Sequence, residues 1–178
     1  MSSTPPTNTP LGQMLIAVVE DGARLWEVQH YIDEGAPLDE TDTKGDTALI
    51  KAAAKNDSDL VEMLLLAGCD PNIPDRDGNT PLIRTVEFIK NGKNALEIIY
   101  DLLARGADPF KTNNQGHDLM HYAEKWKDSH DGIFEAVRSE IALRSEKNKP
   151  AAEKTATKPD HTSHRNLRSY LKIRGIRQ

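Results

Sequence analysis

The sequence predicts an all-helical solenoid built from four helix-turn-helix units, and two spacings carry that prediction. Glycines recur 33 and then 38 residues apart in two parallel series, which are Gly12, Gly45, Gly78 and Gly116, and Gly35, Gly68 and Gly106. Apolar residues stand seven, four and three positions before each glycine of the second series, as at Val61, Leu64 and Leu65. This spacing places them on one stripe of a helix, so each unit contains a helix with one buried face.

The residues that follow the first series of glycines predict another, shorter helix in each unit, which precedes the longer one in the chain and is called the first helix below. Thr47 and Thr80 are suited to cap that helix through the side-chain hydroxyl, and Pro81 suits its first turn. The longer helix then ends at Gly68 or an equivalent glycine, because glycine adopts a left-handed conformation at low cost. Polar stretches such as residues 74–78 turn the chain toward the next unit.

Three segments of the chain repeat one pattern of residues. They are Gly-Asp-Thr-Ala-Leu-Ile-Lys-Ala at 45–52, Gly-Asn-Thr-Pro-Leu-Ile-Arg-Thr at 78–85 and Gly-His-Asp-Leu-Met-His-Tyr-Ala at 116–123. The pattern resembles the ankyrin-repeat signature T-P-L-H-x-A, which recurs about every 33 residues. The resemblance covers residues 11–140 and implies repeats at 11–40, 41–73, 74–111 and 112–140. The first repeat has Met14-Leu15-Ile16 where the signature has Thr-Pro-Leu, and the last lacks its terminal glycine, as expected of units that cap a stack.

The third repeat carries five extra residues between Gly78 and Gly106. The segment from Phe88 to Asn94 either lengthens the first helix of that repeat and presents Phe88 or Ile89 to a partner, or forms a tolerated insertion at a turn. Both interpretations stay open at this point.

The two ends of the chain differ from the repeats in composition and charge. Residues 1–10 are expected to form a disordered leader, and residues 141–164 the end of the last helix followed by a flexible linker. Residues 1–140 hold 13 basic and 25 acidic residues, whereas residues 141–178 hold 10 and 3. The final segment, 165–178, is predicted to be a basic amphipathic tail in which Tyr170 accompanies the cations Arg165, Arg168, Lys172, Arg174 and Arg177.

Several classes of protein are excluded or disfavoured. The longest apolar run, Met14 to Val19, is six residues, whereas a bilayer span needs about 18. No Lys or Arg precedes Arg24, which argues against an ordinary secretory signal. One cysteine, Cys69, excludes an internal disulfide and favours a reducing cytoplasm. Ankyrin stacks occur both in host proteins and in bacterial proteins delivered into hosts, so both origins stay open.

No catalytic residues, metal ligands or cofactor site are predicted. The sequence contains no glycine-rich phosphate loop, nucleophile elbow or HExxH motif. His117 and His121 have a zinc-ligand spacing, but His121 occupies the position where the resemblance implies a structural histidine that ties neighbouring loops. Cys69 matches Ala36 and Ala107 in the repeat register, so we expect it to be a buried small residue.

The resemblance implies a partner-binding strip formed by the loop tips and by the exposed face of each first helix. The loop-tip candidates are Thr43, Lys44, Asp46, Arg76, Asp77, Asn79, Asn114, Gln115 and His117. The first-helix candidates are Lys51, Lys55, Arg84, Glu87, Tyr122, Lys125 and Trp126. Trp126 serves either as a binding residue or as a cap that packs on the last repeat, and the sequence favours the cap somewhat.

The predicted function is a non-catalytic adaptor or inhibitor, a monomer that binds a protein partner on this strip. The alternative is a tether that binds nucleic acid or another anionic surface weakly through the basic tail. The tail carries Leu167, Tyr170 and Leu171 at helical spacing, so docking of the tail on the acidic repeats is a further prediction.

Overall fold

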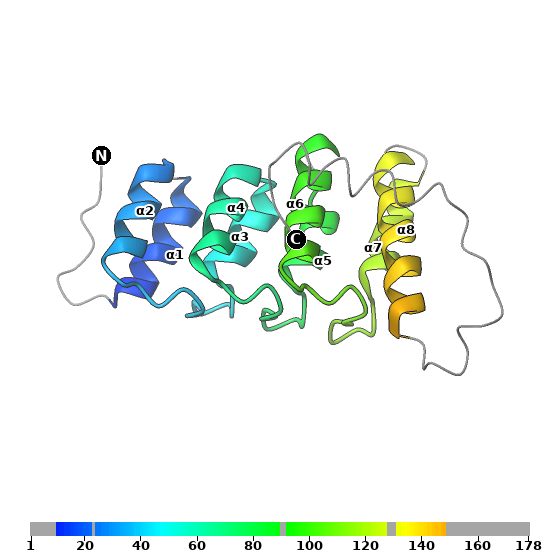
Figure 1. Ribbon diagram of the computed structural model, residues 1–178. Coiled ribbons are helices and arrows are strands. Elements are labelled where there is room, and N and C mark those ends of the chain that lie inside the picture. Colours follow the sequence, from blue (N-terminus) through cyan, green and yellow to red (C-terminus); the bar gives the residue numbers. More distant parts are fainter. Residues whose placement is uncertain (1–9, 23, 90–91, 128–130, 149–178) are drawn as a thin grey trace. The chain divides into compact units, whose positions relative to one another are not determined.

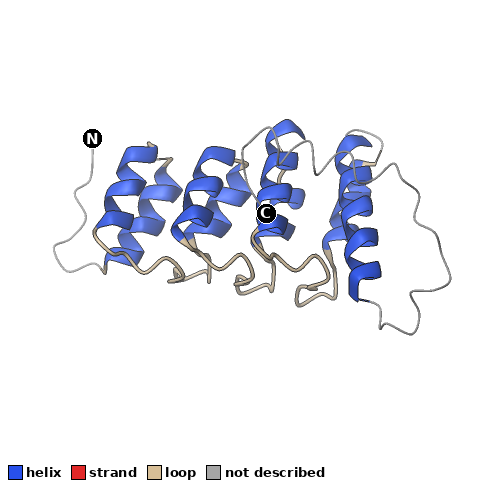
Figure 2. Cartoon of the chain, in the orientation of Figure 1, coloured by secondary structure: helices blue, strands red, loops and turns tan. Residues whose placement is uncertain are grey.

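The computed structural model describes residues 10–22, 24–89, 92–127 and 131–148. The chain divides into two units, residues 1–137 and residues 138–178. All regular elements of the described residues are helical, which confirms the all-helical solenoid (Figure 2). No described helix is long and apolar enough to cross a membrane.

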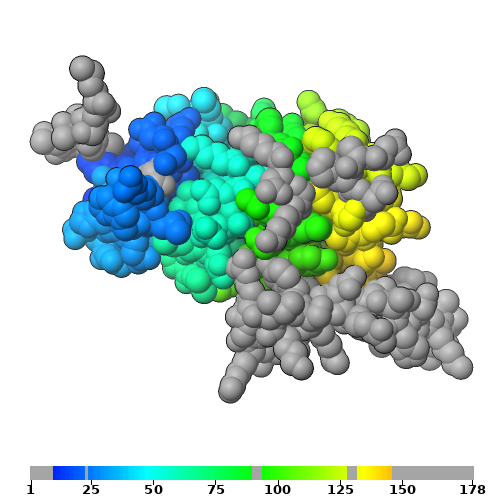
Figure 3. Space-filling model, turned by 90° about the horizontal axis from the view of Figure 1, so that it is seen from above, coloured from blue at the N-terminus to red at the C-terminus, as the bar shows by residue number. Residues whose placement is uncertain are grey.

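The helices of the first unit pair in chain order. The pairs are α1 (Leu11–Asp21) with α2 (Leu25–Asp33), α3 (Ala48–Lys55) with α4 (Ser58–Ala67), and α5 (Pro81–Glu87) with α6 (Gly92–Ala104). A shorter α7 (Leu119–Ala123) is followed by the 3-10 helix η1 (Glu124–Trp126) and by α8 (Asp131–Asn148). The pairs stand side by side with their connecting loops on a common side (Figure 1), and the blue, cyan and green pairs form adjoining bands in Figure 3.

The first helices pack on one another and so do the second helices. α3 lies between α1 and α5, and α4 lies between α2 and α6. Leu49 and Leu82, at the same repeat position, are fully buried in these layers. Ala52 and Ala53 are also fully buried, because a small side chain lets α3 approach its neighbours closely.

The helix ends follow the sequence prediction closely. The Thr47 and Thr80 hydroxyls accept hydrogen bonds from the N–H groups of Ile50 and Ile83, and Pro81 opens α5. Gly68 ends α4 with φ +105°, and the other glycines of its series, Gly35 and Gly106, also have positive φ. The capping and termination rules therefore hold in each middle repeat.

The first glycine of the series is an exception. Gly12 lies inside α1, which begins at Leu11, three residues before the position aligned with the Thr47 cap. A Cβ at Gly12 would overlap the Glu40 side chain, so this glycine serves packing against the following loop and not a turn.

The insertion in the third repeat lengthens the second helix instead of the first. α5 has 7 residues, against 8 in α3, whereas α6 has 13 residues against 10 in α4. Of the two interpretations of the insertion, the longer first helix is therefore wrong, and Phe88 and Ile89 lie between α5 and α6. Phe88 follows α5 and is 45% exposed, while Ile89 is buried.

The second unit contributes residues 138–148 to the described chain, all of them in α8. Within it, Arg144 pairs with Glu140 one helical turn earlier, at 3.7 Å. Residues 1–9 of the predicted leader 1–10, residues 149–164 of the predicted segment 141–164 and the whole tail 165–178 lie outside the described residues, so the predictions about them remain predictions.

Candidate functional site

We call the surface formed by three tip loops and the first helices α3, α5 and α7 the inner face. The tip loops are residues 42–46, 75–79 and 113–117. Each folds around the side chain at its first position, and these side chains are Asp42, Asp75 and Asn113. One oxygen of each accepts hydrogen bonds from the backbone N–H groups two and four residues later, at 2.7 to 3.0 Å. The turn is therefore closed by one side chain in every repeat.

The sequence analysis did not single out these three loop residues. The signal was present, since each stands three residues before a glycine of the first series. Gly45, Gly78 and Gly116 all have positive φ, which explains why glycine recurs at this position.

Neighbouring tip loops are also bonded to one another. The Arg76 N–H donates to the Lys44 carbonyl at 3.4 Å, and the Asn114 N–H donates to the Asp77 carbonyl at 2.9 Å. The Asn114 side chain adds a bond to the Arg76 carbonyl at 2.8 Å. A Cβ at Gly78 would lie 2.7 Å from the Asn114 backbone nitrogen, so glycine also permits this approach.

A buried ammonium group holds the first tip loop on α3. Lys51 is only 7% exposed, and its Nζ lies 2.8 Å from Asp42, 3.2 Å from Asp46 and 3.3 Å from Glu20 of α1. Burial by itself would lower the pKa of Lys51, but the hydrogen bonds to Asp42 and Asp46 outweigh it and raise that pKa above its ordinary value.

The loop carboxylate of the same cluster stays ionised. Burial would raise the pKa of Asp42, but the bond from Lys51 and the N–H groups of Asp46 and Lys44 lower it below its ordinary value of 3.8. Lys51 and Asp42 therefore face each other as a charged pair over the neutral pH range.

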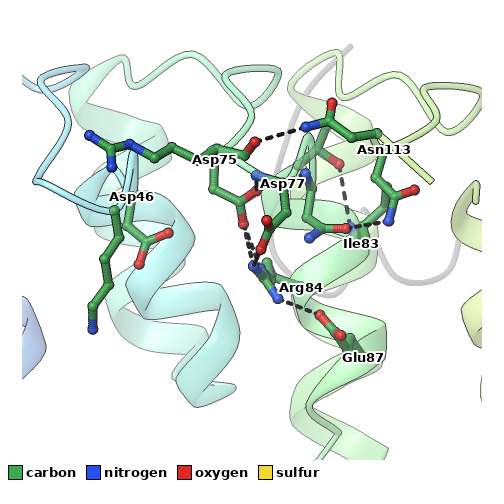
Figure 4. A network of polar contacts seen from close by, with 12 residues as sticks. Asp46, Asp75, Asp77, Ile83, Arg84, Glu87 and Asn113 are labelled. Carbon is green, nitrogen blue, oxygen red and sulfur yellow. Dashed lines mark hydrogen bonds and ion pairs between the residues drawn. The ribbon is translucent and has the colours of Figure 1, made fainter. Parts of the chain in front are cut away.

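Arg84 holds the second tip loop on α5, as Lys51 holds the first tip loop on α3 (Figure 4). Its guanidinium, on α5, reaches Asp75 at 2.5 Å, Glu87 at 2.6 Å and Asp77 at 3.5 Å. The Asp75 side chain is 2% exposed and that of Arg84 is 17% exposed. Burial would lower the pKa of Arg84, but the bonds to Asp75 and Glu87 raise it, so the guanidinium is a fixed charge.

The third tip loop uses uncharged groups at the same positions. The Asn113 amide nitrogen donates to the Asn79 side-chain oxygen at 2.8 Å and to the Tyr122 hydroxyl at 2.9 Å. Tyr122 takes the place of Arg84, and Asn113 takes the place of Asp75. All three members of this network are buried.

These contacts correct part of the predicted binding strip. Lys51, Asn79 and Tyr122 are buried, so they support the tip loops from inside and are not available to a partner. Arg84, Asp46 and Glu87 are partly buried. Asp46 pairs with Lys51, and Arg84 pairs with Asp75 and Glu87. The repeat register alone could not distinguish these supporting residues from exposed ones, because a polar residue that faces a tip loop and one that faces solvent recur with the same spacing.

Other predicted residues do lie on the accessible surface. The exposed loop-tip residues are Thr43, Lys44, Arg76, Asp77, Asn114 and Gln115. The imidazole of His117 stacks on that of His121 with ring centres 3.6 Å apart. His121 is exposed, so the loop tie expected of it is made by Asn113 instead.

The ammonium groups of two lysines flank the inner face. Lys55 donates to the carbonyls of Val19 and Glu20, the former at 2.9 Å, and so caps the carboxyl end of α1. Lys125 lies 4.8 Å from the centre of the Tyr122 ring and is exposed. Both keep a positive charge on this surface.

A hollow of about 370 Å³ opens between α1, α3 and α5. Its apolar lining comes from Ile50, Ala54 and Phe88, and its charged lining from residues of the two ion-pair clusters with Lys44 and Lys55. The exposed Phe88 ring faces the Arg84 guanidinium at 5.6 Å. The hollow can take an apolar side chain that has a polar neighbour.

Trp126 is half-buried and anchored. Its indole N–H donates to the Val86 carbonyl of α5 at 2.7 Å. This bond joins the last repeat to the third, which fits the packing role better than the binding role.

The described residues contain no group of His, Cys, Asp and Glu side chains placed to hold a metal ion. Cys69 is buried, and desolvation raises the pKa of its thiol to about 12. A thiol of that pKa carries almost no thiolate at neutral pH, so Cys69 packs as a small residue. The tail residues Arg165, Arg168, Tyr170, Lys172, Arg174 and Arg177 lie outside the described residues.

Comparison with known proteins agrees with this geometry. A family model described as ankyrin repeats in three copies matches residues 14–113, which is more than half of the chain. The chain belongs to the ankyrin-repeat family. Ankyrin repeats are protein–protein interaction modules, and the family is typically without enzymatic activity.

Several curated proteins are similar to this ankyrin-repeat chain over part of their length. An ankyrin repeat-containing protein of Treponema pallidum is 32% identical over 98 residues, which is 54% of this chain and 31% of that protein. An ankyrin repeat-containing protein of Schizosaccharomyces pombe is 34% identical over 90 residues, 50% of this chain and 40% of its own length. Protein phosphatase 1 regulatory subunit 12A of Mus musculus is 31% identical over 141 residues, 77% of this chain and 13% of its own length. The chain thus spans less than half of each of these relatives.

Proposed function

We propose that the protein acts without catalysis, as an adaptor or inhibitor whose inner face binds a protein partner. The observation that carries the proposal is the way the tip loops are held. Each loop is closed by one side chain and supported by a buried or partly buried group, and neighbouring loops are bonded to each other, while Lys44, Arg76 and Asn114 remain exposed. A surface that is ordered before binding loses less conformational entropy when a partner docks.

The charges on this surface favour a partner segment with acidic character. The acids of the inner face are largely engaged by Lys51 and Arg84, whereas Lys44, Arg76 and Lys125 are exposed. The hollow beside Phe88 supplies an apolar contact next to these cations. An acidic segment with one apolar side chain therefore fits the inner face best. The mouse relative is named as a regulatory subunit, a role compatible with this proposal.

The test compares partner capture by the intact chain and by a variant that carries Lys44→Glu and Arg76→Glu. We expect the variant to capture at least about tenfold less partner, because charges at the edge of an interface control the rate of association. Its melting temperature is expected to stay within a few degrees of that of the intact chain. Arg84 is left unchanged because it anchors a tip loop. Arg24→Glu with Lys111→Glu is the control with the same charge change. Equal capture by both variants and the intact chain would contradict the proposal.

The alternative proposal concerns the tail. Its support is the charge asymmetry, with five basic and no acidic residues in 165–178. A tether of this kind predicts binding to nucleic acid or anionic lipid that weakens steeply with salt and disappears when 165–178 is deleted. Partner capture by the inner face is expected to survive the same deletion. The free, buried Cys69 supports the cytoplasm as the compartment for either role.

A further inference from the structure

A groove on the outer wall of the repeats is separate from the inner face. It lies between α2 and α4, has a volume of about 510 Å³, and takes its apolar lining from Leu25, Ile32, Met63, Leu66 and Ala67. Leu66 is 64% exposed and Leu25 is 38% exposed. Leu25 belongs to the first turn of α2 and Leu66 to the last turn of α4, so exposed leucines line both ends of the groove. Exposed apolar residues gathered in a groove are typical of a surface that binds another chain.

One position of the repeat register distinguishes this groove from the seam of the next repeat. Ala67 precedes Gly68, and the residue at the same place in the next repeat is Arg105, which precedes Gly106. Arg105 directly follows α6 and donates to the Leu65 carbonyl of α4 at 3.0 Å, so it spans the seam between α6 and α4. The methyl group of Ala67 cannot span the seam between α4 and α2.

The charge around the groove selects the occupant. Asp59 and Glu62 of α4 line it, and none of its lining residues is basic. The repeats of a second copy are disfavoured as the occupant, because residues 1–140 carry 13 basic and 25 acidic residues and the repeats of two copies repel each other. A basic partner is attracted by the same negative charge.

We propose that the groove binds an amphipathic helix of a partner protein, with an apolar stripe flanked by Lys and Arg. Leu25 and Ile32 are seven residues apart, so the groove is about 10 Å long and matches two turns of helix. An apolar stripe at i, i+3, i+4 and i+7 fills such a groove, and the flanking cations meet Asp59 and Glu62. The site lies on the second helices, so it is independent of the inner face and adds a second partner surface.

The test uses two synthetic helical peptides of equal length, each with leucine at every third or fourth position. One peptide carries lysine at the flanking positions and the other glutamate. Titration of the isotope-labelled intact chain, followed by NMR, is expected to shift the signals of Leu25, Ile32, Met63 and Leu66 with the lysine peptide. The glutamate peptide is expected to bind at least about tenfold more weakly.

Ala67→Arg is the decisive variant, because it places in this seam the residue that covers the next one. Arginine is a good helix former and is favourable at the end of α4, so the variant is expected to fold. We expect Ala67→Arg to lower the affinity for the lysine peptide by at least about tenfold. Ala104→Arg, which adds the same charge on α6, is expected to change that affinity by less than about twofold. Leu66→Ser, at an exposed position, provides a second weakening variant without added charge.

Three results would overturn the proposal. They are equal affinity of the two peptides, shifts confined to the inner face, and no saturable binding up to about 1 mM peptide. Self-association of the intact chain that Ala67→Arg abolishes would assign the groove to a second copy and also overturn it.

Discussion

The second and third tip loops perform the same structural task with different chemistry. In the second, the Asp75 carboxylate meets the Arg84 guanidinium at 2.5 Å, and in the third the Asn113 amide meets the Tyr122 hydroxyl at 2.9 Å. The first tip loop, with Asp42 and Lys51, is of the charged kind. What the repeat preserves is the contact between loop and helix, and charge is only one way to make it.

The difference has an energetic consequence. A carboxylate buried beside a cation depends on that cation, because removal of one partner leaves an uncompensated charge. The neutral pair loses only one hydrogen bond when it is broken. The charged loops should therefore be the more sensitive part of the inner face.

The largest effect is expected from Arg84→Met. The substitution leaves the 2% exposed Asp75 carboxylate without its cation, so the free energy of unfolding should fall by about 3 kcal/mol. Denaturant unfolding of the intact chain measures it. The matched change in the third loop, Tyr122→Phe, removes one hydroxyl and should cost only about 1 kcal/mol. Equal costs would remove the distinction between charged and neutral loops.

A smaller difference is expected between two glycines. Gly78 and Gly116 both have positive φ, at 83° and 78°, but a Cβ meets a neighbouring backbone only at Gly78. Gly116→Ala should cost about 1 kcal/mol for strain alone. Gly78→Ala should cost about 2 to 3 kcal/mol, because the Asn114 backbone must also move. Similar melting temperatures for the two variants would mean that the bonds between neighbouring loops contribute little.

The fold was predictable because its determinants are local and repeated. Caps at Thr47 and Thr80, the proline that opens α5 and the glycines that end the longer helices are visible in the sequence and recur at a fixed spacing. Gly12 has the spacing of the series, but it serves packing against Glu40 and not a turn. A spacing identifies a position but not the reason for its residue.

The candidate site was predictable only in outline. The exposed tips Lys44, Arg76 and Asn114 follow from register. The buried Lys51 pairs with Glu20 of α1, which lies 31 residues earlier in the sequence. The groove beside Ala67 becomes apparent only by comparison with Arg105, which in the next repeat bonds to the Leu65 carbonyl of α4. Such contacts between repeats need the three-dimensional structure, because no single repeat contains both partners.

The central claim is that an ionised Asp42, facing Lys51, holds the amides of the first tip loop, whereas an uncharged Asn113 holds those of the third. An NMR pH titration of backbone amide shifts in the intact chain tests it directly. Because the pKa of folded Asp42 is lowered, the stability it contributes is present above its ordinary value of 3.8 and is lost as the pH falls through the lower folded value. The Lys44 and Asp46 amides, which donate to Asp42, should therefore titrate with a midpoint below 3.8, while the Gln115 amide, which donates to Asn113, shows no step there. A midpoint at or above 3.8 for Lys44 and Asp46, or a matching step at Gln115, would contradict the account.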